Sequence, residues 1–310
     1  MNILFHILLD IIFPIFVLIG VGALLQRKIR MDLSTLSTLT VYFLLPAVCF
    51  VNIYQSKMSS ELISQTLLFL ILFNILLILT SMFIAKANKF DRKLTATFKN
   101  SMVLSNSGNY GLPVSELVFS ANPAGMSIQI IISIFQNLLT FTYGFFNSVS
   151  AQSSGREILS KIIRLPVIYA LLSAILLKGL NIQIPQFLWK PIENSSNAFL
   201  AVALVTLGAQ VAFLRITRIS RPIVWIVTGR LIISPFVGLL VIYSLGLTGI
   251  TAQALFIASS FPTSRNSALL ALEYDNYPEY ASQAVLLTTV ISSITVAIVV
   301  YLSKILFGNG

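Results

Sequence analysis

Stretches of about twenty mostly apolar residues follow one another along this 310-residue chain, separated by short polar connections. Each is long enough for a helix to cross the roughly 30 Å hydrocarbon core of a bilayer. We place them at approximately 3–25, 34–54, 62–85, 95–120, 126–149, 159–180, 194–214, 220–245, 250–274 and 281–307. Charged residues make up only 10% of the chain, against roughly 25% in soluble domains. The pattern predicts an all-α membrane protein with ten transmembrane helices.

Several other classes of protein are excluded by what the chain lacks. Its formal net charge is +10, but Lys and Arg occur singly or in short clusters rather than on a basic helix, so we expect no nucleic-acid partner. Cys49 is the only cysteine and His6 the only histidine, which argues against a metal site. No Gly-x-x-x-x-Gly-Lys-Ser/Thr loop and no carboxylate pair within a span is present. We therefore expect no enzyme, no cofactor and no nucleotide-driven pump.

The basic residues predict the orientation of the helices. The connections after the first, third, fifth and seventh spans carry Arg27, Lys28, Arg30, Lys86, Lys89, Arg92, Lys93, Lys99, Arg156, Lys161, Arg164, Arg215, Arg218 and Arg221. The opposite side carries Lys57, Lys178, Lys190 and Lys304. Because Lys and Arg favour cytoplasmic connections, we expect an inner (plasma) membrane protein with both termini outside. The acidic connection after the ninth span is an exception, but acidic residues count little in this rule.

Two of the apolar segments are broken at their centres. The fourth contains Ser-Asn-Ser-Gly-Asn-Tyr-Gly-Leu-Pro at 105–113, and the ninth contains Ser-Ser-Phe-Pro-Thr-Ser-Arg-Asn at 259–266. Each is the fourth segment of a half of five spans. Since five is odd, a duplicated second half would be inserted upside down, which predicts an inverted repeat with halves 1–150 and 151–310 in one transmembrane unit. Paired interruptions at corresponding positions typically mark the binding site of a secondary transporter.

The chemistry of such a break favours an anion. Pro113 and Pro262 each remove a backbone donor, and Gly108 and Gly111 make unwinding cheap. We expect Asn109 to cap the helix that resumes after the first break, and Thr263 or Ser264 the one after the second. Each new helix N-terminus carries roughly half a positive charge. Two of them close together would make an anion site. The alternative is a pair of structural kinks.

The motifs at these positions resemble a known family. They are Asn-x-x-x-x-Gly-Leu-Pro (Asn106, Gly111, Leu112, Pro113), Pro-Thr-x-x-Asn (Pro262, Thr263, Asn266) and Tyr-Phe-Leu-Leu-Pro (Tyr42 to Pro46). The chain looks like a bacterial member of the auxin efflux carrier family, within the bile-acid/sodium symporter-like superfamily. The resemblance implies two inverted five-helix repeats, a scaffold and a transport subdomain, and substrate bound where helices 4 and 9 cross. It implies small carboxylates such as malate or malonate, or auxin-like acids, as substrates. The family's crossover asparagine falls on Asn106 and a pocket glutamine on Gln136, whereas Arg265 departs from the general pattern.

These observations define a set of candidate site residues. The substrate-binding candidates are Asn106, Asn109, Gly111, Pro113, Gln136, Asn137, Pro262, Thr263, Arg265 and Asn266. Arg265 stands in the first turn of a half-helix, where a positive charge is locally unfavourable, so we expect it to pair with a substrate carboxylate or with Glu116. Glu116 is the candidate proton carrier, or else the counter-ion of Arg265. We expect Arg230 to snorkel or to pair, and Asn74 to link helices.

The sequence thus predicts a secondary transporter of small organic anions that works by alternating access. Protons and sodium are the candidate coupling ions, the lipid bilayer is the medium, and a homodimer is a candidate assembly. Two alternatives stay open. One is an anion channel built on the same positive crossover, and the other is a cation-coupled antiporter of the related fold, which would need an acidic pair in its core.

Overall fold

The computed structural model of the chain describes residues 9, 13–55, 60–120, 122–148, 166–213 and 219–308, and this part is almost entirely helical. No strand occurs within it. The helices and π turns are α2 (Phe13–Ile29), α3 (Leu33–Leu39), η2 (Thr40–Leu44), α4 (Leu45–Gln55), α5 (Ser60–Ala87), α6 (Arg92–Val103), η3 (Ser107–Gly111), α7 (Leu112–Val118), α8 (Pro123–Leu139), η4 (Thr140–Gly144), α9 (Phe145–Ser148), α11 (Pro166–Gly179), α12 (Gln186–Val211), α13 (Arg221–Thr228), η5 (Gly229–Ile233), α14 (Ser234–Ser244), α15 (Gly249–Ser259), α16 (Arg265–Glu273) and α17 (Pro278–Phe307). His6 lies outside these residues.

Five helices of the described part are long and apolar enough to cross a membrane: Leu33–Gln55, Glu61–Ala87, Pro123–Ser148, Arg221–Ser244 and Pro278–Phe307. Each coincides with a predicted span. The fourth and ninth predicted spans do not qualify because each is divided into two short helices. The sixth begins before Pro166, at residues outside the described part, and ten spans therefore stay a prediction.

Three of the π turns are each followed closely by a proline in the same helix. They are η2, η3 and η5, which end two residues before Pro46, Pro113 and Pro235. A proline ring clashes with the carbonyl four residues earlier in an α-helix. In each case that carbonyl lies within the π turn, whose wider ring accommodates the proline. These prolines are therefore accommodated by local widening and do not end their helices.

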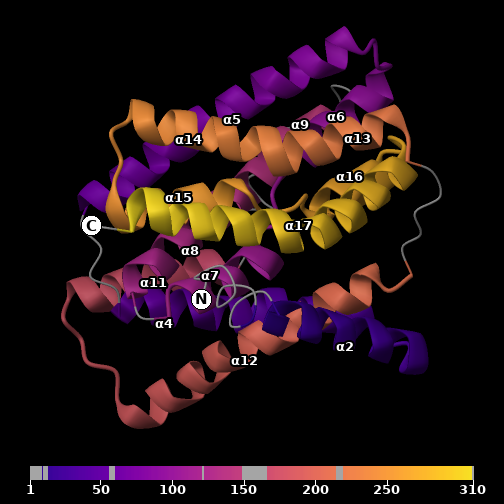
Figure 1. The fold of residues 1–310 in the computed structure, drawn as a ribbon. Helices are drawn as coiled ribbons and strands as arrows, with labels where there is room; N and C mark the ends of the chain where they lie inside the picture. Colours follow the sequence, from indigo (N-terminus) through magenta and orange to yellow (C-terminus); the bar gives the residue numbers. More distant parts are fainter. Residues whose placement is uncertain are drawn as a thin grey trace.

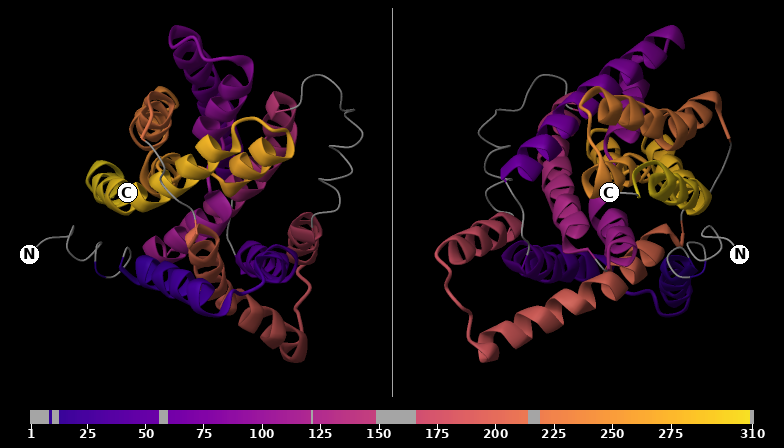
Figure 2. Two further views of the ribbon diagram at one scale, coloured as in Figure 1. Left: turned by 90° about the vertical axis from the view of Figure 1, so that its right-hand side faces the viewer. Right: turned by 60° about the vertical axis from the view of Figure 1, so that its left-hand side comes forward.

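The helices form two layers (Figure 1). One contains α2, α4, α11 and α12, where α12 packs on α2 and α4, and α11 packs on α4. The other contains α5, α6 and α13 to α17, and Figure 2 shows α7 and α8 between the two. In the first layer, a Cβ on Gly22 would overlap the backbone of Val205, and one on Gly208 would overlap that of Ile19. Small residues therefore allow α2 and α12 to meet backbone to backbone, as is typical of membrane helices.

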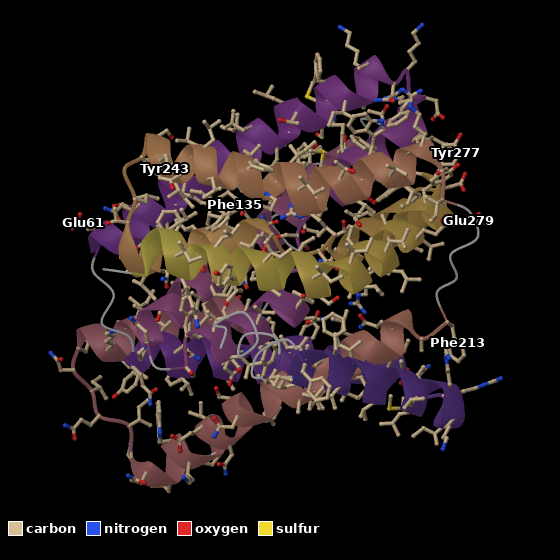
Figure 3. The ribbon with its side chains drawn as sticks, in the orientation of Figure 1. Glu61, Phe135, Phe213, Tyr243, Tyr277 and Glu279 are labelled. Carbon is tan, nitrogen blue, oxygen red and sulfur yellow. The ribbon has the colours of Figure 1, made fainter. Side chains whose placement is uncertain are left out.

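Apolar side chains cover the outside of the described helices and polar ones gather inside. Phe83, Phe187 and Phe236 are 73%, 74% and 68% exposed. Asn100 and Gln129 are buried, and each donates a hydrogen bond to a backbone carbonyl. This distribution suits helices surrounded by lipid, where exposed apolar groups carry no penalty and polar groups need internal partners. In Figure 3 the charged Glu61 and Glu279 lie at opposite ends of the helices.

Two contacts bring connections together at one end of the bundle. The guanidinium of Arg27 donates to the carbonyl of Ala212 at 3.2 Å, which links the last turn of α2 to the end of α12. Lys93 Nζ lies 2.7 Å from Asp275 Oδ2. This hydrogen bond lowers the pKa of the Asp275 carboxyl and raises that of Lys93. The acidic connection after α16 therefore lies beside the basic residues at the start of α6.

Candidate functional site

The two interruptions of the chain lie against each other. We call residues 104–106, between α6 and η3, the first break, and residues 260–264, between α15 and α16, the second break. An antiparallel bridge joins Ser105 to Thr263. Backbone N–H groups donate across it at 2.8 Å, from Asn106 to the carbonyl of Pro262 and from Ser264 to the carbonyl of Leu104. Backbone groups released by unwinding thus partly satisfy one another, as burial requires.

The first helix resumes earlier than its proline suggests. The π turn η3 begins at Ser107, so Asn109 lies inside the helix and cannot cap it, contrary to expectation. Asn106 takes the N-cap position, and its side chain makes no capping hydrogen bond. The side chains of Gln129 and Ser133 on α8 both donate to the carbonyl of Ser107 at 2.8 Å. Tertiary contacts with α8 therefore fix this helix start in place of a local cap.

The second helix start is capped as predicted, by Ser264. Its Oγ accepts a hydrogen bond from the N–H of Asn266 at 3.2 Å. Thr263, the alternative, uses its hydroxyl differently and donates to the carbonyl of Ser101 in α6 at 2.7 Å. Its N–H donates to Thr288 Oγ1 in α17 at 3.1 Å. Thr263 thus anchors the second break to two other helices.

A cavity of about 250 Å³ opens beside both helix starts. It is lined by Tyr42, Leu45, Ser105, Asn106, Ser107, Gly108, Asn109, Gln136, Asn137, Thr140, Val167, Ser264, Arg265 and Asn266. Pockets for drug-sized ligands run from about 300 to 1,000 Å³. This cavity is therefore suited to a smaller ligand.

Six of the ten predicted binding residues line this cavity: Asn106, Asn109, Gln136, Asn137, Arg265 and Asn266. Gly111, Pro113, Pro262 and Thr263 do not. Gly111 has an ordinary helical φ of −69°, but a Cβ there would lie 2.5 Å from Phe261 Cε2 and 2.7 Å from Gln129 Nε2. Gly111 is thus required for the close packing of η3 against the second break and α8. Pro113 lies in the first turn of α7, where a proline is tolerated.

The lining residues outside the predicted set were missed for different reasons. Tyr42 belongs to a motif that the family resemblance already used, and Thr140 follows Gln136 by one helical turn, so both could have been found. Leu45 and Val167 are apolar residues within apolar helices. No sequence signal separates them from residues that face lipid.

The side-chain amides of Asn106 and Gln136 at the cavity differ in how many of their hydrogen-bonding groups have a partner. Asn106 is only 7% exposed, and its Nδ2 has no hydrogen-bond partner among the described residues. Gln136 is held at both ends, because its Oε1 accepts from the Ser105 N–H and its Nε2 donates to Asn74 Oδ1, both at 3.4 Å. Asn74 thereby links α5 to α8, as expected of an interhelical residue. An unpartnered buried amide donor costs free energy unless a ligand satisfies it.

Arg265 faces this cavity and also reaches the other layer. Its Nη1 donates to Ser37 Oγ at 3.1 Å, and Gln210 Nε2 donates to the same hydroxyl at 3.1 Å. The described residues contain no ion pair between Arg265 and Glu116. Glu116 Oε2 is buried without a hydrogen-bond partner in this part of the chain. Within the described residues the guanidinium thus uses one of its five donors, and the others can bind a ligand.

Comparisons with known proteins agree with these observations. A family model described as membrane transport protein matches residues 7–157 and 149–300. A protein of Methanothermobacter thermautotrophicus named "Uncharacterized transporter" is 23% identical over 269 residues, which cover 85% of this chain and 87% of that protein. A protein of Rhizobium meliloti named "Putative malonate transporter" is 25% identical over 310 residues, which cover 95% of each.

These matches extend over most of the chain, and both relatives are named as transporters, not as enzymes. The motifs around the two breaks indicate the same family. The chain is thus an integral membrane protein that belongs to the membrane transport protein family, which is auxin efflux carrier-like.

Proposed function

We propose that this chain is a secondary transporter of small organic anions that binds its substrate where the two broken helices meet. The observation that carries the proposal is the Nδ2 of Asn106, which has no partner among the described residues and lies beside a cavity that two helix N-termini and Arg265 also line. The first N–H groups of a helix have no partner within it. Each N-terminus also carries roughly half a positive charge. The Asn106 amide, the two helix N-termini and the Arg265 guanidinium all donate hydrogen bonds or carry positive charge. They therefore suit a ligand group that accepts hydrogen bonds and bears negative charge.

A carboxylate is the chemical class that fits best. It is acceptor-only when ionised, and a guanidinium can bind it with two parallel hydrogen bonds. The N-terminus at Ser107 with Asn106 would bind one carboxylate, and Arg265 would bind a second or share the first. The malonate named for one relative is a small dicarboxylate, which supports this class. Malate is of the same kind, and auxin-like monocarboxylates are the narrower alternative.

The position of the cavity supports alternating access. Tyr42, Leu45 and Val167 line it from the side of α4 and α11, whereas the two breaks and α8, which lies between the layers, line it from the opposite side. Sliding of one layer past the other would open the cavity to one side of the membrane and close it to the opposite side. We propose that the α2, α4, α11 and α12 layer is the scaffold. The remaining helices would form the transport subdomain, within ten spans arranged as inverted repeats 1–150 and 151–310.

A thermal-shift screen tests the substrate class. Purified protein is heated with a series of mono- and dicarboxylates, each with and without sodium. A ligand at a hundred times its dissociation constant adds about 2.7 kcal/mol of stability. Short dicarboxylates should raise the melting temperature of the wild type, and the rise should shrink in Asn106→Ala. If no carboxylate changes the melting temperature, the proposal is wrong.

A counterflow assay then separates a carrier from a channel. Proteoliposomes preloaded with unlabelled substrate should take up labelled substrate faster than empty ones if the protein alternates between two states. An ohmic anion current without this acceleration would show a channel instead.

A further inference from the structure

Arg230 is a charged side chain that the proposed anion site does not use. It lies in η5, at the middle of the helix that spans Arg221–Ser244, and its exposure is 0%. A cation at such depth needs partners in the protein. Snorkelling to the surface, one of the two expectations from the sequence, is therefore wrong. The described part of the chain contains no ion pair to Arg230 either, and its partners there are neutral.

Its partners are backbone carbonyls from both interrupted helices. Nε donates to Phe261 at 2.8 Å, Nη1 to Met102 at 3.0 Å and to Val103 at 3.4 Å, and Nη2 to Ser259 at 3.0 Å. Met102 and Val103 are the last residues of α6, and Ser259 is the last of α15. One guanidinium thus bridges the C-terminal ends of the two half-helices that lead into the breaks.

The charges at this point are balanced. The last four carbonyls of a helix have no partner within it, and each C-terminus carries roughly half a negative charge. Two such ends together oppose the single positive charge of Arg230. Ser234 Oγ also donates to the Ser259 carbonyl, at 2.6 Å. The guanidinium therefore takes the place of a bound monovalent cation in both charge and ligand type.

Two glycines allow the helix that carries Arg230 to approach both ends. A Cβ on Gly229 would lie 2.9 Å from Met102 Sδ, and a Cβ on Gly238 would lie 2.7 Å from the Ser259 side chain. The carbonyls are thus held around the guanidinium by packing on either side of it. Oxygen ligands from half-helix C-termini and unwound backbone are the groups that hold sodium in ion-coupled carriers.

We propose that Arg230 is a tethered cation that fills a cation-binding shell at the two breaks, and that removing its side chain opens this shell to a small free cation. In the wild type no free cation can bind there. This assignment of Arg230 does not depend on the proposed transport function. Only its consequence for coupling of anion transport to sodium rests on that function. Anion transport by the wild type would then need no sodium at this position.

The test compares melting temperatures of whole purified protein in chloride salts of sodium, guanidinium and choline at equal ionic strength. The wild type should melt at the same temperature in sodium and choline. Arg230→Ala should melt lower in choline and should recover with millimolar guanidinium or sodium, by an amount that grows with the logarithm of the cation concentration. No anion substrate is present, so a failure here is distinct from a failure of the carboxylate screen.

Two further variants complete the design. Arg230→Lys keeps a tethered charge and should fold without a response to sodium. Arg265→Ala removes an arginine that does not contact these carbonyls and should also show no response. Identical melting of Arg230→Ala in all three salts would overturn the proposal. So would a sodium response in the wild type, or failure of Arg230→Ala to fold in every salt while Arg230→Lys folds.

Discussion

Replacing Arg265 by Gln should weaken the binding of a short dicarboxylate while leaving the fold intact. Among the described residues the guanidinium makes one hydrogen bond, to Ser37 Oγ at 3.1 Å, and has no carboxylate partner. Its removal thus breaks no ion pair of the protein that the structure shows. Asn266 follows it at the same helix start and stays in place to line the cavity.

The expected loss of binding free energy follows from the hydrogen bonds that the Arg265 guanidinium would donate to the ligand. A hydrogen bond to a charged group contributes about 1.5–3 kcal/mol. Since 1.4 kcal/mol corresponds to a factor of ten, the dissociation constant should rise roughly 10- to 150-fold. Arg265→Lys should recover only part of this loss, because an ammonium cannot reproduce the planar fork. The loss should be larger for a dicarboxylate than for its monocarboxylate analogue.

Calorimetric titration of both ligands measures these effects, with Ser37→Ala as the control. This variant removes the hydroxyl that holds Arg265 but keeps the charge, so affinity should stay equal or rise. Equal affinities in the wild type and Arg265→Gln would refute the reasoning and leave Arg265 as a link between layers. A loss in Ser37→Ala as large as that in Arg265→Gln would lead to the same conclusion.

Three other predictions concern packing, coupling and topology. Gly111→Leu should reduce transport sharply while the protein still inserts, because overpacking costs about 1–3 kcal/mol. Transport at the wild-type rate would mean that the first break is a structural kink and not part of a binding site. If Glu116 carries the proton, Glu116→Gln should abolish pH-driven accumulation and spare substrate exchange, whereas unchanged accumulation would remove that role. In a Cys49→Ser background, cysteines placed at Lys28 and Lys89 should escape an impermeant thiol reagent in whole cells, and rapid labelling of either would reverse the orientation.

The sequence predicted the positions of both breaks because proline and glycine act locally. It also predicted Ser264, as one of two candidates, from the capping preference of a hydroxyl near a helix start. The Asn109 cap was wrong, since contacts from α8 to the Ser107 carbonyl decide where that helix begins. The partners of Arg230 left no trace in the sequence, because every residue carries a carbonyl. Which carbonyls are free depends on where two helices end in space.

At the two breaks, the positive N-termini and the negative C-termini of the half-helices face different sites. This separation leads to a last prediction, which concerns Asn106. The N-termini face the cavity and the C-termini face Arg230, and the described residues that line the cavity include no carboxylate. Asn106→Asp would place a carboxylate of nearly the same shape at one N-terminus. Such a charge stabilises a helix start by about 0.3–1 kcal/mol, and by up to about 2 kcal/mol when partly buried. The ligand-free variant should therefore melt above the wild type at neutral pH.

The same carboxylate should repel the substrate, so dicarboxylates should no longer raise the melting temperature of Asn106→Asp. Asn106→Leu is the matched control. It removes the amide donor without adding charge and should lose the ligand response without the gain in stability. Thermal melts of the three proteins with and without malonate decide the matter. A preserved malonate response in Asn106→Asp would mean that the anion does not bind at this helix start, and the positive ends of the broken helices would then serve structure alone.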